Sequence, residues 1–191
     1  ALLLITALLG AMGLPGGAVG AGDNSVTGQV ATAVATVAAL AQKAGVCVEI
    51  SLSAVENAMA AQDVAEAELM KAMKSGGKSR IHSAEKTLET RAEEAEEARE
   101  LAKTIIDYAA ECSAALTAAN EEAGRLNREM TDKEQASVLK RLNHLVDIVR
   151  RALKKAEALA ETLKKKWLLP IVTTTTSTTT TTQPPNPTPV G

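Results

Sequence analysis

One segment of the chain carries an unbroken heptad pattern from residue 81 to residue 130. Its two rows are Ile81, Leu88, Ala95, Ala102, Ala109, Leu116, Ala123 and Met130, and Ala84, Arg91, Ala98, Ile105, Cys112, Ala119 and Leu126. Apolar residues that alternate at spacings of three and four form the narrow stripe with which a long helix packs along partner helices. At 1.5 Å per residue this helix would be about 75 Å long. The pattern predicts a rod, which favours display and contact over an enclosed catalytic pocket.

Composition and charge narrow the fold class and the partners. Aromatic residues make up 1% of the 191 residues and Phe is absent, so Ala, Leu and Val must form the core. Such a core suits closely packed helices, whereas strands favour β-branched and aromatic side chains. The formal net charge of −2 gives no basic excess that would attract nucleic acid. We therefore predict an all-α protein that does not bind nucleic acid.

Three stripes predict an elongated, antiparallel three-helix bundle with coiled-coil-like packing over residues 23–170. Its helices are expected at about 25–74, 79–130 and 132–169. The glycines after Ser75 suit a helix end, and Thr131 with Glu134 has the spacing of a capping box. Short connections make neighbouring helices antiparallel. Since the stripes can cover one another within one chain, a monomer is expected.

Two irregularities interrupt the stripes. The first stripe shifts register after a β-branched patch at residues 46–50, which either changes the supercoil locally or marks a break capped by Ser53 and Glu56. Arg91 places a charge in an otherwise apolar row, and we expect its long side chain to reach solvent near the end of the bundle. The antiparallel register also predicts that acidic residues near Glu97 lie beside basic residues near Lys166.

Residues 1–22 resemble the remnant of a secretory signal peptide. An apolar run is followed by a zone of small residues, and no charge precedes Asp23. The alternative is a hydrophobic first helix of the domain. In an oxidising compartment Cys47 and Cys112 would form a disulfide, and hairpin geometry brings them to within about two turns of each other. In the cytosol they would instead be buried thiols.

The tail at 171–191 is rich in Thr and Pro and is expected to be a disordered stalk, because it has little to bury in a core. Its Thr tract is typical of O-glycosylated stalks, although an unmodified linker has the same composition. The candidate O-glycosylation sites are Thr173, Thr174, Thr175, Thr176, Ser177, Thr178, Thr179, Thr180, Thr181 and Thr182.

The sequence has few residues in arrangements that would support catalysis. His82 and His144 lie on different predicted helices, and neither has a second ligand at helical spacing, so no metal site is expected. Adjacent glutamates at 93–97 diverge around a helix and suit a solvated face. No combination of nucleophile and base is apparent. We expect no catalytic residues, no cofactor and no enzymatic activity.

A signal-like start, an Ala/Glu-rich bundle of three long helices and a Thr/Pro tail resemble the glycolipid-anchored surface proteins of insect-stage trypanosomes. These are the alanine-rich, glutamic acid/alanine-rich and metacyclic invariant types. The resemblance covers the whole chain in layout and implies a parasite coat protein on the outer face of the plasma membrane, without enzymatic activity. It implies a glycosylphosphatidylinositol anchor as well, although the hydrophobic tail of an anchor signal is not present in this chain.

The sequence favours a surface spacer or contact module whose partner is a host or vector macromolecule. A receptor for a macromolecule or a small ligand is the main alternative, and an intracellular coiled-coil adaptor is a third. With the tail tethered to a membrane, the turn between the second and third helices lies furthest away. The candidate membrane-distal contact residues are Arg125, Asn127, Arg128 and Lys133.

Overall fold

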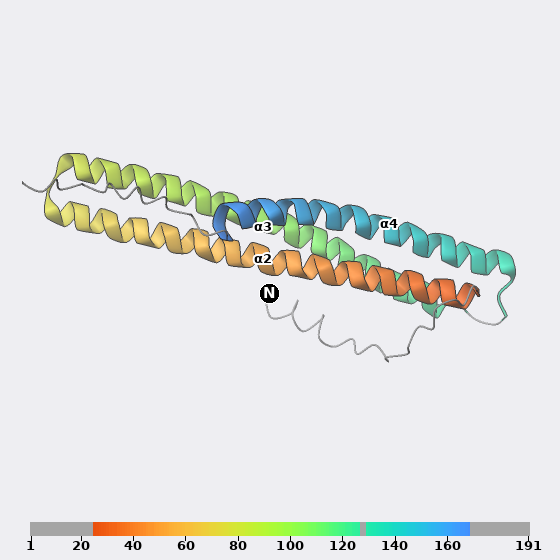
Figure 1. Cartoon of the computed structure of the whole chain (residues 1–191). Helices are drawn as coiled ribbons and strands as arrows, with labels where there is room; N and C mark the ends of the chain where they lie inside the picture. Colours follow the sequence, from red (N-terminus) through yellow and green to blue (C-terminus); the bar gives the residue numbers. More distant parts are fainter. Residues whose placement is uncertain (1–24, 127–128, 169–191) are drawn as a thin grey trace, which may run out of the picture.

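Three long helices form an elongated antiparallel bundle, without strands in the residues that the structure describes. The computed structural model describes residues 25–126 and 129–168. Helix α2 spans Val26–Ser75, α3 spans Lys78–Gly124 and α4 spans Asp132–Leu163, with a final π-helical turn η1 at Lys164–Leu168. Figure 1 shows α2 and α3 as a long hairpin, with α4 along part of its length. The predicted all-α three-helix bundle is confirmed.

Helix α2 is continuous over 50 residues. Its first turn is capped by Ser25, whose hydroxyl accepts a hydrogen bond from the Gly28 N–H at 3.1 Å. It ends at Gly76, whose φ of 77° lies in the left-handed region that glycine adopts without strain. The predicted alternative of a break capped by Ser53 is wrong, because the register shift is absorbed within one helix.

The composition of α2 also suits a membrane. An 18-residue window of this helix has a mean hydropathy of 1.5, and by length and composition it could cross a bilayer. In the structure one third of that window is buried against the other helices. An alanine-rich core helix satisfies the same criterion, so the hydropathy of α2 is compatible both with a place in the bundle core and with a membrane span.

Helix α3 ends earlier than the heptad predicts. We expected helix to residue 130, but α3 stops at Gly124 and the chain turns, with the Leu126 N–H donating to the Ala123 carbonyl at 3.1 Å. Leu126 and Met130 nevertheless pack partly buried against the core. The heptad spacing continues because Leu126 and Met130 still face the bundle after the helix has ended. The helix ends at Gly124 because glycine weakens helical structure.

Small side chains form most of the core. Ala44, Ala54, Ala98 and Ala156 are fully buried. The larger buried residues include Ile105 and, on α4, Val138, Leu142, Val146, Val149, Leu153 and Leu163. Alanine lets helix backbones approach closely, while α4 supplies the bulk that fills the space between α2 and α3. On the outside, the Lys155 ammonium lies 5.3 Å from the centre of the Tyr108 ring. The chain has almost no aromatic residues, and the larger aliphatic side chains of α4 therefore fill the core in their place.

Helix α4 covers only part of the α2–α3 hairpin. Its last turn lies level with Asn57, whose side-chain amide donates to the Trp167 carbonyl at 3.0 Å, and with Glu97, which pairs with Lys166. The predicted acidic–basic register between α3 and α4 is confirmed by that ion pair. Beyond this level only α2 and α3 continue among the described elements, as Figure 1 shows. We call residues 58–75 of α2 with 78–95 of α3 the arm.

The capping box that starts α4 should make stability depend on pH. The Thr131 N–H and hydroxyl each donate to the Glu134 carboxylate at 2.8 Å, and these bonds lower the pKa of Glu134. The ionised form therefore contributes stability above the unfolded pKa of about 4.3, and this is lost as the pH falls through the lower folded pKa. We expect Thr131→Ala to cost about 1 kcal/mol at pH 7 and less at pH 3, measured by urea unfolding.

Glu134→Gln is the matched control for this prediction. The Gln side chain can still accept from the Thr131 N–H, but it does not titrate. The pH-dependent part of the Thr131→Ala effect should therefore disappear in the Glu134→Gln background. An equal cost of Thr131→Ala at both pH values in the wild-type background would contradict the assignment.

Candidate functional site

The α3–α4 end holds the predicted contact residues. Arg125 is the C-cap of α3, and Lys133 lies exposed in the first turn of α4. Asn127 and Arg128 lie outside the described residues. The structure therefore places two of the four candidates at one end of the rod, on either side of the connection between α3 and α4.

One carboxylate organises the cations at this end. Glu122 has a side chain that is 14% exposed, and it accepts from Arg125 at 3.0 Å and from Arg141 at 2.8 Å. The second contact joins α3 to α4, so Glu122 fixes both the helix end and the interhelical register. Arg125 therefore helps to hold the end of α3 through its ion pair with Glu122. Its side chain is still largely exposed and can make further contacts. Sequence reasoning missed Arg141, because its pairing with Glu122 depends on the tertiary register.

The two cysteines are buried thiols in the same core. Cys47 lies on α2 and Cys112 on α3, and both are free in the structure. Burial raises the pKa of Cys112 to about 11, with smaller contributions from Glu111 and from Cys47. Burial also raises the pKa of Cys47, helped by Glu157 and Glu161 of α4. The thiols are therefore protonated and poor nucleophiles at neutral pH, and their disulfide stays a prediction.

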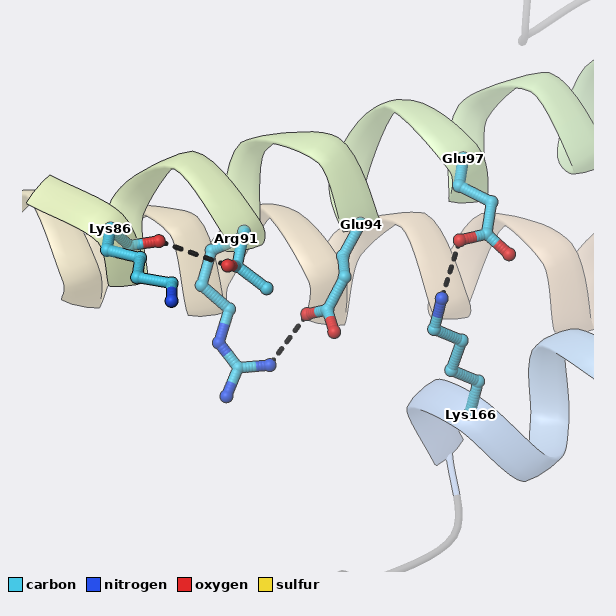
Figure 2. Close-up of polar contacts among 6 residues, drawn as sticks. Lys86, Arg91, Glu94, Glu97 and Lys166 are labelled. Atoms are coloured by element: carbon cyan, nitrogen blue, oxygen red, sulfur yellow. Dashed lines mark hydrogen bonds and ion pairs between the residues drawn. The ribbon is translucent and has the colours of Figure 1, made fainter.

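Arg91 marks the end of the three-helix region. Its guanidinium pairs with Glu94 at 2.7 Å, and its side chain is 42% exposed. In Figure 2 this ion pair lies on α3 next to the Glu97–Lys166 contact, just beyond the end of η1. The expected exposure of Arg91 near the end of the bundle is confirmed. The charge is tolerated because, of the helices that the structure describes, only α2 lies beside the stripe at that level.

A shallow groove runs along the arm between α2 and α3. Its volume is about 390 Å³, and its lining mixes small apolar, hydroxyl and charged side chains: Ala65, Glu68, Lys71, Ala72, Ser75, Arg80, Ser83, Ala84 and Thr87. Val64 lies one heptad after Asn57, the residue that contacts η1, so this side of the arm continues the path of α4.

The described part of the chain has no group of three or more His, Cys, Asp or Glu side chains placed to hold a metal ion. The predicted signal segment 1–22 and the candidate glycosylation sites of the Thr tract lie outside the described residues. Comparisons of the chain with protein-family models, with curated proteins and with solved structures found no match.

Proposed function

We propose that this protein is a non-enzymatic, cell-surface contact module that presents the α3–α4 end of a helical rod. The observation that carries the proposal is the shape: helices of 50, 47 and 32 residues lie along one another around a narrow core of small side chains. Such a rod separates its ends by many nanometres and provides long outer faces. The signal-like start and the resemblance to trypanosome coat proteins support a location on the outer face of the plasma membrane, held by a lipid anchor.

The direction of α4 supports the α3–α4 end as the outward one. Helix α4 begins at this end and, through η1, leads to Leu168 near the middle of the rod, so the described part of the chain ends away from the α3–α4 end. Arg125 and Lys133 are exposed cations at this end, and Arg128 adds a third in sequence, among exposed acids that include Glu121, Asp132 and Glu134. Such mixed charge supports individual ion pairs with a host or vector macromolecule rather than a general attraction for acidic partners.

The test of this proposal is the binding of labelled protein to intact host or vector cells. We expect Arg125→Ala, Asn127→Ala, Arg128→Ala and Lys133→Ala, made together, to reduce binding at least tenfold, as loss of several charge contacts does. The matched control replaces three cations and one Asn on the side of α4, at Asn143, Arg150, Arg151 and Lys154. Circular dichroism verifies that both variants keep their helices.

The control variant should bind as the wild type does. Equal loss in both variants would assign the effect to net charge and contradict a contact at the α3–α4 end. Unchanged binding by the first variant would move the contact to the helix flanks.

A further inference from the structure

The arm has almost no core of its own. Between residues 59 and 94 only Ala65 and Ala72 are buried, and the main core ends at Ala58 and Ala95. Two alanines remove little apolar surface from water for a hairpin of this length. The expectation of a monomer assumed that three stripes cover one another along the rod. That premise does not hold for the arm, because α4 ends at its base.

Large apolar side chains are exposed on the arm. Five large hydrophobic residues are exposed in the part of the chain that the structure describes: Val46 lies outside the arm, and Met59, Val64, Met70 and Met73 lie on it. At 100° per residue the three methionines fall within about 60° of one another around α2, whereas Val64 lies about 140° from Met59, towards the groove. We call the side of α2 that carries Met59, Met70 and Met73 the Met face. Flexible, polarisable methionines are common at protein-binding surfaces.

Charge along the arm changes sign halfway. Residues 56–69 carry four acidic side chains and no basic one, and residues 70–84 carry four basic side chains and no acidic one. The acids are Glu56, Asp63, Glu66 and Glu68, and the bases are Lys71, Lys74, Lys78 and Arg80. Two arms side by side in the same direction would place like charges together. Two arms in opposite directions place the basic tip of each beside the acidic base of the other.

We propose that two copies of this chain pair antiparallel through the Met faces of their arms. A two-fold axis near residue 66 or 67 brings Met59 of each copy to within one residue of the level of Met73 of the other, and the overlap is about 27 Å long. Glu66 lies at the axis and faces its own copy, with Glu68 close to it, while the charges further from the axis meet the opposite sign. The four arm helices then form a bundle in which each pair covers the other's exposed methionines. The two α3–α4 ends remain free at the far ends of the assembly. The pairing follows from the fold and does not depend on the proposed function.

Sedimentation velocity of the whole chain over a concentration series tests the pairing. We expect the wild type to dimerise, and Met70→Glu with Met73→Glu to raise the dimer dissociation constant about 30-fold or more, as loss of a central interface residue does. Val64→Glu is the control for position: it replaces an exposed apolar side chain of the same arm with Glu on the groove side, adding one negative charge where the methionine variant adds two, and should leave the dimer intact. Circular dichroism excludes loss of helix as the cause.

Charge reversal tests the direction of pairing. Lys71→Glu with Lys74→Glu gives an entirely acidic α2 arm, and Asp63→Lys with Glu66→Lys and Glu68→Lys gives an entirely basic one. Each variant alone should fail to dimerise, and an equimolar mixture should recover the dimer. A wild type that stays monomeric at 100 µM would overturn the proposal. A Val64→Glu effect equal to that of the methionine variant would also overturn it. So would a protein that stays monomeric and binds vesicles of anionic lipid through its basic tip, at Lys71, Lys74, Lys78 and Arg80.

Discussion

Ile105→Ala should lower the free energy of unfolding by about 2–5 kcal/mol, the range for truncating a large buried aliphatic side chain. Ile105 is fully buried and, with Leu142 and Leu163, is among the largest fully buried side chains of the described residues. Most of its core neighbours on α2 and α3 are alanines or valines, which cannot extend into the space left by the lost atoms. The cavity should therefore persist, which adds its own cost to the lost transfer free energy. Urea unfolding followed by circular dichroism measures the change.

Val46→Ala is the control for this experiment, because Val46 is β-branched like Ile105 but half exposed on the same three-helix region. We expect it to change stability by no more than about 0.5 kcal/mol. A further variant, Ile105→Val, should cost about 0.5–1.5 kcal/mol, since it removes one methylene. Similar losses at positions 46 and 105 would mean that the bundle interior is loosely packed and that the heptad rows do not define its core.

The heptad rows predicted the fold because helix packing is a local property of the sequence. Ala95, Ala98, Ala102, Ile105 and Cys112 all lie on the predicted rows, and all are buried. Their spacing alone determines which face of α3 is apolar, and short connections determine the antiparallel order. The Glu97–Lys166 pair followed from the same register. No information about distant contacts was needed for these predictions.

The lengths of the stripes misled the prediction at both ends of α3. Near residue 130 the apolar spacing continues through a turn, because Leu126 and Met130 reach the core without helical backbone. Near residue 81 the stripe continues along the arm, where α4 no longer covers it. Periodicity reports which side chains face a neighbour, but it does not report how many neighbours there are. In the sequence, the charge of Arg91 within an apolar row indicated the level at which α4 and η1 no longer cover α3.

The sequence predicted which end of the bundle holds the candidate contact residues, but not the interactions among them. Capping explains Thr131 and Glu134, and the sequence shows this directly. The bridge from Glu122 to Arg125 and Arg141 could not be predicted, because it depends on how α3 and α4 align at that end. The exposure of Met59, Met70 and Met73 could not be predicted either, because heptad spacing does not show whether a neighbour covers a given face of α2.

Protein secreted through an oxidising compartment should contain a Cys47–Cys112 disulfide, and its reduction should lower the free energy of unfolding by about 2–4 kcal/mol. Both thiols are buried on adjacent helices, and each is shielded from external reagents. A bond between them would close most of the α2–α3 hairpin and restrict the unfolded chain. Non-reducing peptide mapping detects the bond, and urea unfolding with and without reductant measures its contribution.

Alkylation must be carried out in denaturant, because the raised pKa of Cys112, about 11, keeps the thiol unreactive in the folded protein at pH 8. Bonded cysteines remain unlabelled in urea until a reductant is added, whereas buried free thiols are labelled at once. Cys112→Ala removes the bond and should make stability insensitive to reductant, which separates the disulfide from other effects of reduction. Labelling of both cysteines in urea without reductant would contradict the bond and would assign Cys47 and Cys112 to core packing alone.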